Sequence, residues 1–229
     1  MNAIEKNLKE FKSELENSEK DSRESWNHLT ELIRKAENRG GEILKLSKEA
    51  INNSINGNFA SASKTISRGN KAIKIFNNNI LFLKKEVAKF ITQSKIEIGK
   101  IGELKISKLD EDFLNAREEF LEAYFLFTYL KTGELPNLTN PLLRDFRIYA
   151  GALADFCGEL IRHARLSVIK GKDPTSEVKK YQKLLNEIYQ SLSGFAFSNR
   201  SGVRKKVEHL KEYIGELENI LYTHKGNSK

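Results

Sequence analysis

The sequence predicts an all-α protein, a bundle of seven helices without strands, and three observations support this fold class. Apolar residues recur at helical spacings of three, four and seven along most of the chain. Helix-breaking residues are scarce, since the 229 residues include only three prolines and 14 glycines. Charged residues make up 31% and hydrophobic residues 39%, a balance typical of a helix-rich globular protein. We expect one domain over residues 1–225 and a disordered tail at 226–229.

The N-terminal half is expected to hold three helices. The first covers residues 2–38 and ends at the Asn-Arg-Gly-Gly break at 38–41. The second covers 42–56, is amphipathic and ends at Gly57. The third covers 59–92. Its apolar face is formed by residues spaced three, four or seven apart, namely Ile66, Ile73, Phe76, Ile80, Leu83, Val87 and Phe90.

Two strongly apolar helices should follow and form the core of the protein. After a less regular segment at 95–109, Asp110 is expected to cap a helix over 111–131. Asn140 should open the next helix, which covers 141–170 and ends before a glycine.

Two more helices are expected before the C-terminus. Asp173 and Pro174 predict the N-cap and the first helical position of a helix that ends at about Leu192. After a turn over 193–202, the last helix should cover 203–224.

The net charge of +8 is concentrated in one part of the sequence. Residues 64–108 contain 11 lysines and arginines against three glutamates, a difference of +8 that equals the surplus of the whole chain. Localised basic charge suggests a polyanionic partner, nucleic acid first. Lys64, Arg68 and Lys71 share one helix face and are the candidate phosphate contacts, which carry no sequence information. The alternative is a lysine-rich face that only keeps the protein in solution.

Several classes of protein are not expected from this sequence. No apolar run approaches the roughly 20 residues of a transmembrane helix, and the charged N-terminus is no signal peptide, so no membrane partner is expected. The single cysteine, Cys157, excludes a disulfide framework and indicates a reducing, cytoplasmic setting. It is expected to be buried and structural, not nucleophilic. Nucleotide-binding glycine motifs are absent, and the four histidines do not have the spacing of zinc ligands.

Two pairs of acidic residues lie in the two most apolar helices. The stretch GALADFCGELIRHA, residues 151–164, carries Asp155 and Glu159 one turn apart, and REEFLEAYFLF upstream carries Glu119 and Glu122. Isolated carboxylates are costly to bury, so they must be paired, protonated or bound to a metal. If the two helices pack together, the four acids can converge. Carboxylate oxygens without histidine or thiolate suit Mg²⁺, with Mn²⁺ as the alternative.

The same acids are open to two other interpretations. The first is a set of ordinary salt bridges, with Glu159 paired to Arg162 or Arg165 and Glu119 paired to a nearby basic residue. The second is a di-iron helical bundle, which requires Glu-x-x-His on two helices. Here Glu159 and His163 are four residues apart, so the di-iron pattern fails.

The residues around these acids resemble the translin superfamily, and more closely its translin-associated factor X branch. GALADFCGELIRHARLSVIKGK, residues 151–172, resembles the family segment G-V-A-D-L-T-G-E-L-M-R, and EFLEA, residues 119–123, resembles that branch's E-Y-V-E-A. The stretch 184–225, with SLSGFAFSN, RKKVEHLK and IGELENILYTHK, is similar to the closing helices of the family. The first half of the chain fits in helix pattern and length only. E-x-x-E combined with D-x-x-x-E is fairly specific, although neither part is specific alone.

The resemblance implies a subunit of seven helices that assembles into a closed homo-oligomeric shell, an octamer by expectation, around single-stranded RNA or DNA. It also implies a Mg²⁺-dependent endoribonuclease site whose four acids fall on Glu119, Glu122, Asp155 and Glu159. Glu122 and Asp155 are the expected metal ligands. Glu119 would be a ligand or the base that orients water, and Glu159 would support the others from outside.

We therefore predict a microbial, cytoplasmic endoribonuclease that acts on single-stranded RNA. One alternative is a catalytically silent, translin-like oligomer that binds single-stranded RNA or DNA, and another is a structural helical bundle with no nucleic acid. The chain departs from the family at Cys157, where a small hydroxyl residue is frequent. Its segment 95–109 also lacks the aromatic, histidine-rich character of animal members, so substrate contacts are not expected to carry over there.

Overall fold

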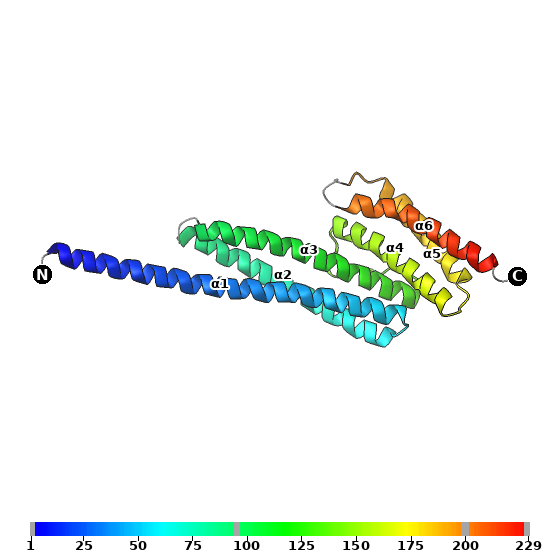
Figure 1. Cartoon of the computed structure of the whole chain (residues 1–229), viewed down its shortest axis with the longest axis horizontal. Coiled ribbons are helices and arrows are strands. Elements are labelled where there is room, and N and C mark those ends of the chain that lie inside the picture. Colours follow the sequence, from blue (N-terminus) through cyan, green and yellow to red (C-terminus); the bar gives the residue numbers. More distant parts are fainter. Residues whose placement is uncertain (1–2, 94–96, 198–201, 227–229) are drawn as a thin grey trace. The chain divides into compact units, whose positions relative to one another are not determined.

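The computed structural model describes the backbone of residues 3–93, 97–197 and 202–226, and side chains at 23–24, 26–89, 105–197 and 202–223. Every regular element in these ranges is helical, with six α-helices and one short 3-10 helix (Figure 1). The predicted all-α class is therefore confirmed, with six long helices in place of seven. The expected tail lies outside the described residues, except that Gly226 is the last residue of the final helix.

The first three helices are long. They are α1 (Ala3–Ile55), α2 (Phe59–Gln93) and α3 (Glu97–Thr132). The predicted limits of α2 are confirmed to within one residue. All of the apolar positions expected on its core face are buried, apart from Phe90, whose side chain lies outside the described residues.

The predicted break in the first helix is wrong, because α1 continues through residues 38–41. Gly40 is buried, and a Cβ atom there would lie 3.1 Å from the ring of Phe76. The glycine thus lets α1 and α2 approach closely, while a glycine inside a helix costs only about 1 kcal/mol. Tertiary packing outweighs the local preference, so the two expected helices become one.

The predicted start of α3 is wrong as well. Asp110 lies inside the helix, not at its N-cap, and its carboxylate forms an ion pair of 2.7 Å with Lys84 of α2. The predicted helix over 141–170 is divided into a 3-10 helix, η1 (Pro141–Leu143), and α4 (Phe146–Ile169). Asn140 caps the first of these.

A second cap, Asp145, separates η1 from α4. Its Oδ1 accepts a hydrogen bond of 3.0 Å from the backbone N–H of Arg147, which starts α4 five residues later than expected. The last helices are α5 (Thr175–Ser193) and α6 (Val203–Gly226). The expected N-cap at Asp173 is wrong by one residue, because α5 begins at Thr175 and Pro174 is its N-cap; Asp173 Oδ1 nevertheless accepts a hydrogen bond of 2.9 Å from the N–H of Thr175.

The chain groups into two compact units. Unit 1 consists of Met1–Gly41 and Lys74–Phe113, and unit 2 consists of Glu42–Ile73 and Leu114–Lys229. In unit 1, the rings of Phe76 and Phe113 meet edge to face at a centroid distance of 5.0 Å. Its buried core consists of Leu29, Ile33, Ala36, Phe76, Ile80, Leu83, Val87, Ile106, Leu109 and Phe113.

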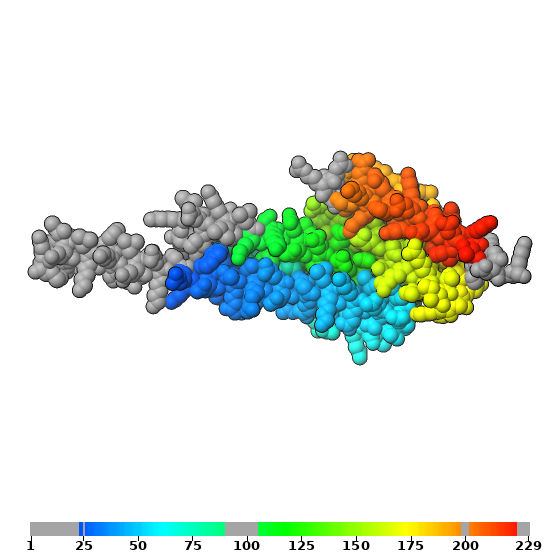
Figure 2. Space-filling model, viewed as in Figure 1, coloured from blue at the N-terminus to red at the C-terminus, as the bar shows by residue number. Residues whose placement is uncertain are grey.

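Unit 2 contains α4, α5 and α6, and each of these three helices packs against the other two (Figure 1). On the face shown in Figure 2, α6 (orange to red) adjoins the C-terminal part of α4 (yellow). The largest fully buried side chains of this unit are Phe120, Phe125, Phe156, Ile43, Ile73, Leu121, Leu126 and Leu143. They include residues of both helices that were expected to form the core. No helix in the described ranges is long and apolar enough to cross a membrane.

Candidate active site

A polar pocket of about 520 Å³ lies in unit 2, where α3, α4 and α6 meet. The structure brings all four acids singled out in the sequence to the lining of this pocket, which we call the acid pocket. They are Glu119 and Glu122 of α3, and Asp155 and Glu159 of α4. The remaining lining residues are Gly158, Ile161, Arg162 and Arg165 of α4, and Lys206, Tyr213 and Glu216 of α6.

Helical spacing explains why these side chains converge. On α4, Gly158 and Glu159 lie three and four residues after Asp155, and Arg162 lies three residues after Glu159, so these residues form one stripe. On α3, Glu119 and Glu122 are three residues apart and also share a face. The apolar residues between them turn toward the core, where Phe120, Leu121 and Phe156 are at most 1% exposed.

Glu122 is the most unusual residue in the acid pocket. It is only 7% exposed, and it forms no hydrogen bond or ion pair with any side chain that the structure describes. Burial raises the pKa of its carboxyl group to about 9, and repulsion by Asp155, Glu119 and Glu159 adds to the increase. A carboxylate in this position needs either a proton or a cation to be stable at neutral pH.

The other acids differ in how they are neutralised. Glu159 accepts a hydrogen bond from Arg162 at 3.1 Å, so the salt bridge weighed as an alternative for Glu159 is present. Arg165 instead pairs with Glu216 of α6 at 2.6 Å. Glu119, like Glu122, forms no ion pair within the described side chains.

A lysine that the sequence did not reveal lies at the centre of this arrangement. The ammonium group of Lys206 donates a hydrogen bond to Asp155 Oδ2 at 2.5 Å and another to Oε1 of Glu118. Burial works against its charge, but the hydrogen bonds to Asp155 and Glu118 outweigh burial and raise its pKa. In the sequence Lys206 stands in the charged stretch RKKVEHLK, where nothing separates it from its neighbours.

Two glycines of α4 allow neighbouring helices to come close to Asp155. A Cβ atom at Gly151 would lie 2.6 Å from the carboxylate of Glu118, and one at Gly158 would lie 3.2 Å from the hydroxyl of Tyr213. Glycine inside an apolar helix pattern is a sequence signal from which such close approaches could have been inferred.

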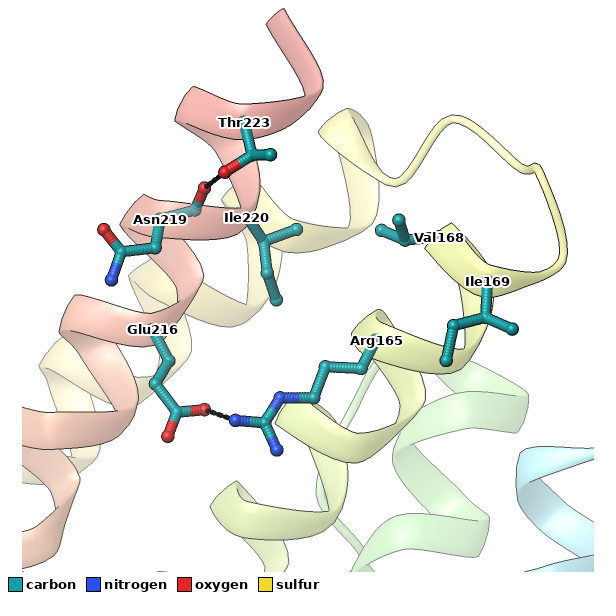
Figure 3. Close-up of a pocket in the computed structure, with 7 residues that line it drawn as sticks. All are labelled: Arg165, Val168, Ile169, Glu216, Asn219, Ile220 and Thr223. Atoms are coloured by element: carbon teal, nitrogen blue, oxygen red, sulfur yellow. Dashed lines mark hydrogen bonds and ion pairs between the residues drawn. The ribbon is translucent and has the colours of Figure 1, made fainter. Parts of the chain in front are cut away.

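A second cleft of about 490 Å³ adjoins the acid pocket between α4 and α6 (Figure 3). It shares Arg165 and Glu216 with the acid pocket, and their ion pair forms the boundary between the two. Beyond this pair its walls are more apolar, with Val168, Ile169 and Ile220. Apart from this shared pair, the charged lining residues of these two adjoining pockets all belong to the acid pocket.

The donor set of the acid pocket has the chemistry of a hard-cation site, but it is not assembled as one. The lining residues include five carboxylates and three basic side chains, which leaves a surplus of two negative charges. Oxygen donors with this surplus suit Mg²⁺ or Mn²⁺. However, no three histidine, cysteine, aspartate or glutamate side chains in the described part of the chain are placed so that they could hold a metal ion.

The three predicted phosphate contacts lie on α2 in unit 2. Lys64, Arg68 and Lys71 are all exposed, at helical spacings that place them on one face. Cys157 is fully buried, as expected, and burial raises the pKa of its thiol. The metal-binding and catalytic roles of the four acids stay predictions, as does phosphate binding by the three basic residues of α2.

Comparison with known proteins places this fold. The sequence model of the Translin family matches residues 61–225, which is well over half of the chain. No curated protein matches the chain. Among solved structures, apo-NeC3PO is similar with a TM-score of 0.63 and 21% identity, over 89% of this chain and 95% of that chain.

Two structures of AfC3PO are also similar. The complex with duplex RNA has a TM-score of 0.54 and 18% identity, over 96% of this chain and 97% of that chain. AfC3PO in a second crystal structure has a TM-score of 0.55 and 17% identity, over 96% and 98%. At these identities the likeness concerns the fold. The match of the family model over residues 61–225 shows that the chain belongs to the Translin family.

Proposed function

We propose that this protein is a Mg²⁺-dependent endoribonuclease of the translin-associated factor X branch, which cleaves single-stranded RNA inside a closed homo-oligomer, an octamer by expectation. The observation that carries this proposal is Glu122, a carboxylate that is 7% exposed and has no partner among the described side chains, in a pocket with surplus negative charge. A purely structural helix would place an apolar residue at such a position.

The charge of the acid pocket supports a divalent cation as the missing component. One ion of charge +2 would balance the surplus of two negative charges among the lining residues. When bound, such an ion supplies Lewis-acid stabilisation of the charge that develops on a phosphodiester under attack. Glu122 and Asp155 are the proposed ligands. Glu119 would be a further ligand or would orient a water molecule. Glu159 would support the ligands from outside, with its own carboxylate fixed by the ion pair to Arg162.

RNA binding is supported by family membership and by the basic surface. AfC3PO, which has the same fold, was solved in complex with duplex RNA. On this chain the exposed residues Lys64, Arg68 and Lys71 are the proposed contacts to the phosphate backbone. Binding through phosphates should be sensitive to salt and weakly selective for sequence. Neutralising all three residues should reduce the slope of log affinity against log salt by about 2, at roughly 0.7 for each phosphate contact of a single strand.

A catalytically silent oligomer that binds single-stranded RNA or DNA is the second candidate, and specific contacts favour it. Lys206 already neutralises Asp155, and Arg162 already neutralises Glu159. If these ion pairs persist in solution, two of the four acids serve structure and not catalysis.

Cleavage of a fluorescent single-stranded RNA by the wild-type protein in Mg²⁺, Mn²⁺ or EDTA tests the proposal. The variants Glu122→Gln and Asp155→Asn should lose cleavage and keep RNA binding and elution volume. Glu111→Gln is the matched control, because Glu111 is an exposed acid on the same helix, α3. The same sequence as a duplex forms a second substrate, since AfC3PO was solved with duplex RNA. Binding without cleavage in every metal would favour the silent oligomer.

A further inference from the structure

Lys206 connects two carboxylates that come from two different helices. Its ammonium group, on α6, donates hydrogen bonds to Asp155 of α4 and to Glu118 of α3. The lysine side chain is 36% exposed, so the bridge is partly shielded from water. Partly buried charge-assisted hydrogen bonds are stronger than exposed ion pairs, so this bridge should hold Asp155 in a fixed position.

The backbone of α4 is shaped to accept this bridge. Gly151 lies one turn before Asp155, and its missing side chain leaves the space that the Glu118 carboxylate fills. Any larger residue would displace Glu118, because a Cβ atom would lie 2.6 Å from its carboxylate. Glu118 is therefore positioned by the fold. Burial raises the pKa of Glu118, although Lys206 works in the opposite direction.

The bridge engages one of the acids in the donor set of the acid pocket. The Asp155 oxygen that Lys206 contacts belongs to one of the two carboxylates proposed as metal ligands. Glu122, the other, is buried, aimed into the pocket and unpartnered in the described structure. The positive charge of Lys206 is thus held at Asp155, while the carboxylate with the greatest need for a cation has none.

We propose that Lys206 is the resident counter-cation of the acid pocket, that it would release Asp155 when a divalent cation is bound there, and that Glu118 would retain Lys206 after this exchange. This inference rests on the proposed function in one respect, since it takes the divalent cation as the ligand of the pocket. Glu118 is then a positioning residue that acts through Lys206, and it does not touch the metal. Lys206 lowers the apparent affinity for the cation, because each binding event must first separate it from Asp155.

Mn²⁺ affinity, measured on the full-length protein from the EPR signal of free Mn²⁺, tests this exchange. Lys206→Gln should bind Mn²⁺ about tenfold more tightly than the wild type, because it removes the positive charge that competes for Asp155. The matched control is Arg162→Gln, which also removes one positive charge from the pocket lining but leaves Asp155 untouched. The control should change affinity by no more than about threefold, the effect of general electrostatics at a half-exposed pair.

Glu118 supplies the sharper arm of the experiment. In the wild-type background, Glu118→Gln should weaken Mn²⁺ binding severalfold, because Lys206 then has Asp155 as its sole carboxylate partner in the bridge. In the Lys206→Gln background the same substitution should have no effect, since there is no lysine left to retain. A double-mutant cycle measures this coupling directly. A general loss of negative charge would instead weaken binding equally in both backgrounds, and that result would overturn the proposal.

The remaining outcomes separate this proposal from the proposed function. Equal affinities of Lys206→Gln and Arg162→Gln would overturn the role of Lys206 and leave a metal site intact. Absence of Mn²⁺ binding in both the wild type and Lys206→Gln would overturn both proposals. If Lys206→Gln does not fold, as judged by circular dichroism, crystals of the wild type with and without Mn²⁺ decide. Lys206 should then be found with Glu118 alone when Mn²⁺ is present, and a bridge unchanged by Mn²⁺ would contradict the exchange.

Discussion

Two pockets of unit 2 have nearly the same volume and opposite charge, and their comparison shows which charges matter. The acid pocket has a volume of about 520 Å³. The other pocket, of about 540 Å³, is lined by Lys170, Lys172 and Lys180 together with Glu177, and we call it the lysine pocket. Helix α4 borders both pockets, because it contributes Asp155 to the acid pocket and His163 to the lysine pocket. Each lining has an imbalance of two charges.

The difference lies in solvation. All four charged residues of the lysine pocket are exposed, so water stabilises them. Lys170 also caps the C-terminal end of α4, where helix carbonyl groups favour positive charge. Two less exposed polar groups of the lysine pocket satisfy each other, since the Tyr181 hydroxyl and the His163 Nδ1 lie within hydrogen-bond distance, at 2.9 Å. The surplus charge of the acid pocket instead includes Glu122, which is only 7% exposed and forms no hydrogen bond or ion pair with any described side chain. A charge imbalance indicates a ligand only where it is buried.

Substitution in the two pockets should separate them most clearly in RNA cleavage. Glu122→Gln should lower the rate by about 1,000-fold, because it removes a proposed metal ligand while keeping the shape of the side chain. Lys172→Gln, in the lysine pocket, should leave the rate within about threefold. The measurement is the initial rate on single-stranded RNA in Mg²⁺. Comparable losses of cleavage rate in both variants would show that burial of the charge imbalance does not identify the active pocket.

The pH dependence of stability should differ between the pockets in the metal-free protein. The pKa of Glu122 is raised from 4.5 to about 9 on folding, so the folded state binds more protons than the unfolded state between these values. The contribution of Glu122 is therefore most favourable near pH 4.5 and decreases as the pH rises to about 9. Even half of this increase in pKa corresponds to a decrease of about 3 kcal/mol in the free energy of unfolding.

Urea unfolding of the wild type and Glu122→Gln across this pH range measures the effect. The variant should lack the decline, because glutamine does not titrate. If the wild type and the variant have parallel profiles, Glu122 is not the buried acid that this account describes.

Glycine substitutions test whether the acid pocket is built by close packing. Gly151→Ala should destabilise the protein by about 2 kcal/mol, because the new methyl group would displace the Glu118 carboxylate. Gly215→Ala on α6 is the matched control, since nothing lies within 4 Å of a Cβ atom there. Alanine should stabilise that position by about 0.5–1 kcal/mol through its better helix propensity. Thermal unfolding followed by circular dichroism compares them. A stabilising effect at both sites would mean that Glu118 is free to move.

The smallest effect is expected for the stability of lysine-pocket variants. Lys170→Gln and Lys180→Gln should change the free energy of unfolding by no more than about 0.5 kcal/mol, because both side chains are exposed. They should also leave Mn²⁺ affinity unchanged. A larger change in either quantity would show that the lysine pocket holds a ligand of its own.

The sequence predicted most of the helices but not all of their ends. The apolar face of α2 follows from helical periodicity, and the hydrogen bond of Asp173 at the start of α5 follows from side-chain chemistry, so both were predictable. Gly40 and Asp110 were misjudged because their roles depend on distant residues. Gly40 packs against Phe76, and Asp110 pairs with Lys84. Local signals alone do not reveal such contacts.

The acid pocket was predictable in part for a similar reason. Glu122 and Asp155 stand out as acids in apolar helices, and the structure places them in one pocket. Lys206 and Glu118 do not stand out, because each has other charged residues beside it in the sequence. Only the packing of α6 on α4 selects Lys206 from its neighbours. The residues that neutralise a site are therefore harder to predict than those that create its charge.

The number of Mn²⁺ ions bound per chain at saturation tests the central claim most directly. The account predicts one tightly bound ion per wild-type chain by EPR, lost in Glu122→Gln and kept in Glu111→Gln. A wild-type chain that binds no Mn²⁺, or a Glu122→Gln chain that binds it as tightly as the wild type, would contradict the claim that this buried carboxylate holds a divalent cation.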